Sequence, residues 1–147
     1  MITETTKHIS KSPVTGKEYE IPVVLDDKKG IDDFIALHPG KKVVVVQGLG
    51  FVGSVMGLVV ANALTEEYAV IGIDLPTPQS YWKIRSINEG VFPVIASDPK
   101  IDIYYQNALA KKNYYATFDG HERIHYKRSG EPVGYKSAYH SYMGTAL

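Results

Sequence analysis

The chain has no cysteine among its 147 residues. Disulfide frameworks, thiolate zinc sites and thiol nucleophiles are therefore excluded as a basis for its fold or chemistry. It also has no net charge, because 16 Lys and Arg residues balance 16 Asp and Glu residues. A nucleic-acid or anionic-membrane partner consequently has no electrostatic basis in this composition.

Long hydrophobic runs are lacking as well. The longest apolar helical stretch, residues 55–64, is shorter than the ~20 residues that span a bilayer. Residues 1–30 contain no apolar core typical of a secretory signal. We therefore expect a soluble, cytoplasmic protein with neither a membrane nor a nucleic-acid partner.

The most informative stretch is residues 43–53, where four valines lead into glycines spaced as G-x-G-x-x-G. The pattern is typical of a buried strand, a tight turn and a helix start. Gly48 permits the turn, Gly50 lets a pyrophosphate approach the backbone, and Gly53 lets the helix pack close to the sheet. A helix N-terminus also favours an anion. The predicted dinucleotide site includes Gly48, Leu49, Gly50, Phe51, Val52 and Gly53.

A helix, a second strand and an acidic residue complete a βαβ pattern. Apolar residues at helical spacing predict a helix whose inward stripe is Val52, Val55, Met56, Val59, Val60, Ala63 and Leu64. The apolar run 69–73 ends at Asp74 and predicts a parallel strand covered on both faces. Asp74 lies 21 positions after Gly53, near the ~20-residue offset at which a carboxylate meets the adenosine ribose.

Asp74 also predicts which cofactor binds. A carboxylate accepts hydrogen bonds from a free 2′-hydroxyl and repels a 2′-phosphate. No arginine adjoins Asp74, the nearest in sequence after it being Arg85. The pattern therefore favours NAD over NADP.

The other segments have weaker patterns. Residues 1–12 predict a loose terminus, residues 13–25 a hairpin or edge strand, and residues 26–30 a solvated linker. Further helices are predicted over 31–37, 80–90 and 98–112. Ser80 is expected to cap the second of these helices, and Ser97 or Asp98 the third. A third strand is predicted over 114–118.

These elements together predict an α/β fold. We expect a Rossmann-like, three-layer parallel sheet with residues 43–47 at its centre and the other two strands to one side. Residues 1–40 form an N-terminal extension, 41–119 the NAD-binding domain, and 120–147 a polar, Tyr-rich tail. This sheet is incomplete relative to a full dinucleotide-binding domain, because no strand is predicted on the other flank of residues 43–47. We therefore expect a homo-oligomer or a marginal fold.

A series of motifs resembles one enzyme family. The motifs are Gly48-Leu49-Gly50-Phe51-Val52-Gly53, Ile71-Gly72-Ile73-Asp74, Lys83 with Ile87-Asn88-x-Gly90-x-x-Pro93, and Tyr115-Ala116-Thr117-x-Asp119. In this order they resemble the N-terminal NAD domain of the UDP-glucose/GDP-mannose dehydrogenase family. The likeness covers 77 of the 147 residues. One position departs from it, since Ala96 stands where the family has a Glu, and Asp98 lies two residues on.

The resemblance implies NAD-dependent oxidation of the C6 alcohol of a UDP- or GDP-sugar to the uronate. The family uses a cysteine thiolate for the second oxidation and builds the sugar pocket largely in a second domain. This chain has no cysteine, and residues 120–147 give no pattern of such a domain. We therefore predict NAD(H) binding without catalytic residues, and a nucleotide sugar bound only with the absent segments.

Two alternatives stay open. The chain could be a non-catalytic remnant or interaction domain with a Rossmann fold. More remotely, His121-Glu122-Arg123-Ile124-His125 matches the H-E-x-x-H pattern of zinc hydrolases. Gly120 and the Gly130–Pro132 segment disfavour a long helix there, so we predict no metal site.

Overall fold

The computed structural model describes residues 8–119. Its elements are β1 (Ile9–Lys11), β2 (Glu18–Glu20), α1 (Lys28–Ala36), β3 (Lys42–Gln47), α2 (Phe51–Ala61), β4 (Tyr68–Ile73), α3 (Tyr81–Glu89), α4 (Pro99–Lys111) and β5 (Tyr114–Thr117). The predicted α/β class and the three predicted strands are confirmed.

The strands β3, β4 and β5 form one parallel sheet in that order. Its register pairs Val43 with Ala69 and Gly72 with Ala116. The central strand is β4, so the prediction that residues 43–47 lie at the centre is wrong. Within residues 8–119, β3 is an edge strand, because no described strand pairs with its other side. The expected homo-oligomer stays a prediction.

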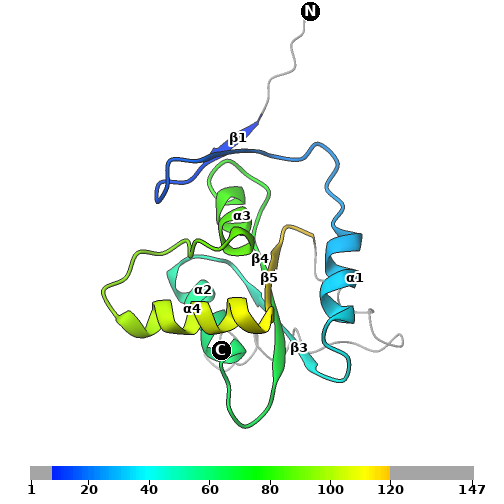
Figure 1. Cartoon of the computed structure of the whole chain (residues 1–147). Coiled ribbons are helices and arrows are strands. Elements are labelled where there is room, and N and C mark those ends of the chain that lie inside the picture. Colours follow the sequence, from blue (N-terminus) through cyan, green and yellow to red (C-terminus); the bar gives the residue numbers. More distant parts are fainter. Residues whose placement is uncertain (1–7, 120–147) are drawn as a thin grey trace, which may run out of the picture.

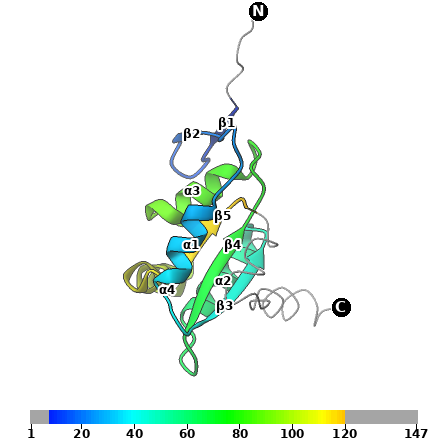
Figure 2. The ribbon, with the colours of Figure 1, turned by 90° about the vertical axis from the view of Figure 1, so that its right-hand side faces the viewer.

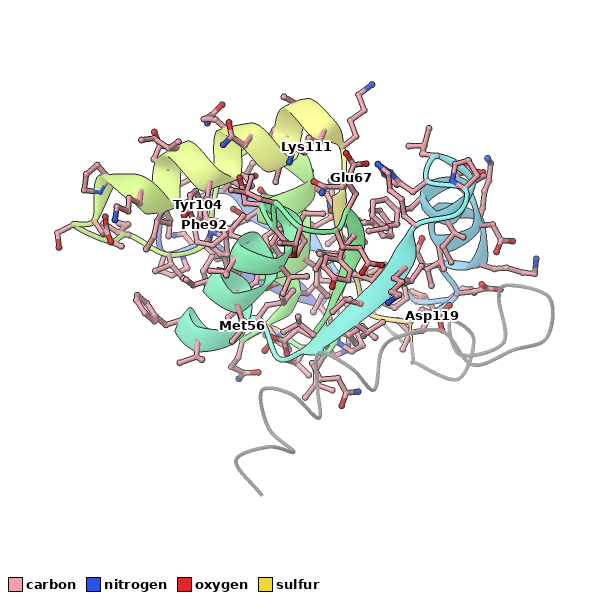
Figure 3. All side chains as sticks on the ribbon, turned by 90° about the horizontal axis from the view of Figure 1, so that it is seen from below. Met56, Glu67, Phe92, Tyr104, Lys111 and Asp119 are labelled. Carbon is pink, nitrogen blue, oxygen red and sulfur yellow. The ribbon has the colours of Figure 1, made fainter. Side chains whose placement is uncertain are left out.

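Helices cover both faces of the sheet (Figure 1). Side chains alternate along β3, as in any strand. Val43 and Val45 face α1 and share a buried cluster with its Phe34, whereas Val44 and Val46 share a cluster with α2 and α4. Side chains fill the space between α2, α4 and the strands (Figure 3). The predicted three-layer, Rossmann-like architecture is confirmed.

The α2 helix faces the sheet with its small residues. The residues of α2 that are buried are Gly53, Ser54, Gly57, Leu58 and Ala61. Val52 and Val59, two members of the predicted inward stripe, are each half exposed, and Leu64 lies beyond the helix and is 97% exposed. The predicted stripe is therefore wrong.

Close approach of α2 to the sheet explains why its glycines, and not its valines, lie on the inner face. A Cβ added at Gly57 would lie 2.4 Å from the Tyr114 hydroxyl, which donates a hydrogen bond to the Ser54 carbonyl (3.1 Å). A valine at position 57 would have no room above the Tyr114 ring. Glycine at position 57 thus allows α2 to pack close to the sheet.

The N-terminal segment is more ordered than its pattern predicts. A hairpin is confirmed, but its first strand, β1, lies within residues 1–12, which were predicted to be loose. The Ser12 hydroxyl accepts hydrogen bonds from the Val14 and Thr15 amides and holds the hairpin turn. The predicted linker at residues 26–30 is also wrong, because α1 already begins at Lys28.

The ends of α3 and α4 show two kinds of cap. Asp98 accepts a hydrogen bond from the Lys100 amide and caps α4 as predicted. Ser80 occupies the N-cap position of α3, but its side chain makes no capping hydrogen bond. The Trp82 amide in the first turn of α3 instead donates to the hydroxyl of Ser10 on β1 (2.8 Å). A residue from the hairpin therefore supplies the cap that the sequence assigned to Ser80.

Across residues 8–119, every helix is too short or too polar to traverse a bilayer.

The orientation of α2 predicts unequal costs for two neighbouring substitutions. Leu58 is fully buried, and Leu58→Ala should lower the free energy of unfolding by about 2–5 kcal/mol. Val59 is half exposed, and the matched control Val59→Ala should cost less than about 1 kcal/mol. Urea unfolding measures both, and equal costs would contradict the orientation.

Two enclosed tyrosine hydroxyls predict a loss of stability in alkali. Enclosure beneath α2 raises the pKa of the Tyr114 hydroxyl, and burial likewise raises the pKa of Tyr105. The pKa of each hydroxyl in the folded state exceeds the unfolded value of about 10. Its contribution to the free energy of unfolding is therefore complete below pH ~10 and is lost as pH rises through the folded pKa. For Tyr114 the loss is up to about 1.4 kcal/mol per pH unit. Denaturant unfolding between neutral and alkaline pH should show a shallower decline in Tyr114→Phe; an identical decline would contradict the assignment.

Candidate functional site

The glycine turn joins β3 to α2 in a conformation that needs two of its glycines. Gly48 has a φ of +92°, which residues other than glycine rarely adopt. Its amide donates a hydrogen bond to the Ile73 carbonyl of β4 (2.7 Å). A Cβ added at Gly53 would lie 1.8 Å from the Gly48 carbonyl oxygen. No other residue fits at position 53 unless the helix moves away from the strand.

Gly50 differs from both of these glycines. Its φ is −71°, which any residue can adopt, and an added Cβ would meet no atom within 4 Å. The backbone at Gly50 therefore faces open space. Directly after it, α2 begins at Phe51 with no acidic residue in its first turn, and the amides of a first helical turn lack intrahelical partners. The turn thus presents amides and a positive helix end to an open region.

Leu49, between these glycines, points inward. It is fully buried, and a Cβ added at Gly72 of β4 would lie 2.6 Å from its Cδ2 atom. Gly72 therefore makes room for Leu49, and the Leu49 side chain anchors the turn in the core.

Asp74 lies beside the same turn. Its Oδ2 atom accepts a hydrogen bond from the Leu49 amide (2.8 Å), and its Oδ1 atom accepts one from the Leu75 amide (2.7 Å). The structure thus brings the predicted carboxylate and the predicted glycine turn into direct contact. Each carboxylate oxygen retains capacity for a further donor.

A cation lies near Asp74, and the sequence did not predict this pairing although it named Lys83 as a motif residue. The Lys83 ammonium, on α3, lies 3.8 Å from the Asp74 Oδ2 atom, and the two side chains are only 23% and 12% exposed. Arg85, the nearest arginine after Asp74 in sequence, binds Glu89 instead (2.7 Å). Lys83 is nine positions after Asp74, and it comes close only because α3 folds back over the ends of the strands. The sequence spacing alone does not predict this contact.

The remaining predicted residues line the outer part of the turn. Phe51 and Val52 are 58% and 50% exposed at the start of α2. Phe51 borders a groove of about 580 Å³ between α2 and the segment leading into α4, with Ile95 and Tyr104 on its opposite wall. Gly50 and Asp74 do not line this groove.

Asn88 and Gly90, two motif residues of the resemblance, fix the position and the end of α3. The Asn88 side chain donates to the Ala116 carbonyl (2.8 Å) and accepts from the Ala116 amide (2.9 Å), so it pairs with the outer edge of β5. Gly90 ends α3 with a φ of +98°. Asp98, two positions after Ala96, caps α4.

A second polar cluster was not predicted. The hydroxyls of Tyr115 and Thr117 both donate to the Asp27 Oδ2 atom (2.6 Å each), and the Asp27 amide donates to Asp119 (2.9 Å). Burial, with Asp27 close by, raises the pKa of Tyr115. A Cβ added at Gly30 would lie 2.1 Å from the Tyr115 hydroxyl, so this cluster ties α1 closely to β5.

No group of three or more potential metal ligands occurs in the described part of the chain. The His121–His125 motif lies outside the described residues.

Comparison with known proteins gives structural neighbours only. No protein-family model matches the chain, and no curated protein sequence matches it. Among solved structures, the chain is similar to an NDP-N-acetyl-D-galactosaminuronic acid dehydrogenase from Methanosarcina mazei Go1, with 23% identity and a TM-score of 0.51 over 65% of this chain. It also matches a UDP-glucose dehydrogenase from the hyperthermophilic archaeon Pyrobaculum islandicum, with 19% identity and a TM-score of 0.46 over 60% of this chain.

Both neighbours are nucleotide-sugar dehydrogenases, and this chain spans about a fifth of the length of each, 20% and 18%. The first likeness supports a Rossmann-type fold. The second, with its lower TM-score, adds nothing to that argument.

Proposed function

We propose that this chain binds NAD(H) at the turn of residues 48–53 and at Asp74, as the cofactor-binding part of a nucleotide-sugar dehydrogenase. The observation that carries the proposal is the contact between the two predicted halves of the site. The Leu49 amide of the turn donates to Asp74 at 2.8 Å, so a ligand that reaches one half also reaches the other.

The turn fits the pyrophosphate of a dinucleotide. Open space at Gly50 lets phosphate oxygens approach the backbone, and the N-terminus of α2 supplies amides and a favourable dipole. Neither feature requires a basic side chain, which agrees with the absence of net charge.

Asp74 fits the adenosine ribose. Its two backbone donors hold the carboxylate in place, and each oxygen can accept a ribose hydroxyl in addition. Lys83 offsets part of the negative charge of Asp74, so discrimination against the 2′-phosphate of NADP is expected to be smaller than for an unpaired carboxylate.

The nucleotide-sugar assignment rests on the ordered motifs and on the kind of neighbour found. When bound, NAD accepts a hydride from an alcohol carbon of the substrate. The described residues bind and orient the cofactor, and we assign no catalytic role to any of them.

Calorimetry with NAD tests the binding. We expect heat of binding at millimolar NAD, and Gly50→Val should weaken binding by at least about tenfold, or 1.4 kcal/mol, because the new side chain fills the space at the turn. Valine fits the backbone at position 50, so the unfolding midpoint should stay close to that of the wild type. Unchanged affinity in a folded Gly50→Val chain would contradict the site.

Comparison of NAD with NADP tests Asp74. Hydrogen bonds to a charged group contribute about 1.5–3 kcal/mol, so Asp74→Ala should lower NAD affinity about 10- to 100-fold and NADP affinity less. Asp102→Ala, the same change on the first turn of α4, is the matched control and should alter neither. An equal loss for both dinucleotides would indicate a loosened turn rather than a lost ribose contact.

A turn that binds no dinucleotide would favour the alternative of a non-catalytic remnant or interaction domain. Crystals soaked with NAD distinguish the two, because a remnant would show no ligand density at Gly50.

A further inference from the structure

We infer that Ser10, on the N-terminal hairpin of β1 and β2, is a positioning residue for Asp74 in the proposed cofactor site. This inference rests on the proposed NAD site and adds a segment outside its motifs. The hairpin lies over α3 at the end of the sheet (Figure 2), and its Tyr19 and Ile21 share a buried cluster with Leu49 of the glycine turn.

The Ser10 hydroxyl joins both sides of the segment that follows Asp74. It donates to the Pro78 carbonyl (2.8 Å) and accepts from the Trp82 amide (2.8 Å), and the residue is fully buried. Pro78 lies four positions after Asp74, and Trp82 immediately precedes Lys83. One hydroxyl therefore fixes the backbone four positions after Asp74 and immediately before Lys83.

The segment from Asp74 to Pro78 is stiff, so a restraint on Pro78 also restrains Asp74. Pro76 and Pro78 each fix one backbone dihedral angle, and the Thr77 carbonyl accepts the Ser80 and Tyr81 amides (3.0 and 2.8 Å). A segment with few free dihedrals that is held at Pro78 leaves Asp74 little freedom.

The hairpin has its own contacts with α3. Lys17 and the Tyr19 hydroxyl approach the Glu89 Oε1 atom (3.2 and 3.3 Å), and the Arg85 guanidinium lies over the Tyr19 ring at 4.9 Å from its centroid. These contacts dock the hairpin without Ser10. The Ser10 hydroxyl is therefore available for positioning rather than needed for attachment.

The hairpin also provides a matched control. Ser12 is as buried as Ser10, but within residues 8–119 its hydroxyl accepts hydrogen bonds from the hairpin amides of Val14 and Thr15 alone. Ser12→Ala and Ser10→Ala are the same chemical change on one hairpin, and only Ser10→Ala removes a contact with the segment after Asp74.

The test measures NAD and NADP affinity of the full chain by calorimetry. Loss of a neutral hydrogen bond predicts that Ser10→Ala weakens NAD binding about 2- to 10-fold and moves the NAD-to-NADP ratio toward that of Asp74→Ala. Ser12→Ala should leave the ratio unchanged, and Ser10→Ala should add nothing in the Asp74→Ala background. An unchanged ratio in Ser10→Ala, or an equal shift in Ser12→Ala, would overturn the inference.

Amide hydrogen exchange separates this inference from the proposed function. The Leu49 and Leu75 amides both donate to Asp74, so they should exchange faster in Ser10→Ala than in Ser12→Ala, without any ligand. If the wild type binds neither dinucleotide, the proposed function fails, and with it the cofactor role of the hairpin. Equal exchange rates in the two variants would overturn the positioning by Ser10 itself.

Discussion

The close approach of α2 to the end of β3 is the constraint on which most of this structure depends. A single methylene at Gly53 would lie 1.8 Å from the Gly48 carbonyl oxygen, so the helix can start where it does only with glycine there. The same approach continues along the helix at Gly57, above Tyr114. The first turn of α2 is thereby held at the sheet end, where the Leu49 amide meets Asp74.

This constraint explains why hydrophobic periodicity misplaced the face of α2. The valines and methionine of α2 form an apolar stripe that would bury more area per residue than its glycines and serine. Distance to the sheet outweighs area here, because close contact at Gly53 and Gly57 excludes larger side chains at these two positions, and the inner face keeps Leu58 as its one large buried side chain. The glycine spacing already contained this information at position 53, and Gly57 extends it by one helical turn.

The elements that could be predicted are those whose signals are local. Strands made of apolar runs and the cap at Asp98 follow from neighbouring residues, and both appear in the structure. Asp74 was predicted from its offset within one βαβ unit, and the structure places it in contact with the glycine turn. The cap of α3 could not be predicted, because its acceptor, Ser10, lies 72 positions away. The pairing of Lys83 with Asp74 and the role of Asp27 could not be predicted either, since each depends on a partner on another element.

The long-range contacts also connect the N-terminal residues to the proposed site. Periodic patterning assigns residues 8–40 no part in dinucleotide binding, yet the hairpin packs with Leu49 and holds the segment after Asp74. On the other side of the sheet, α1 is tied to β5 through Asp27. A three-stranded sheet has few neighbouring strands to fix the ends of its loops. Here the hairpin supplies that support to the Asp74 end of β4, and the geometry of the proposed site depends on a segment that precedes its first motif.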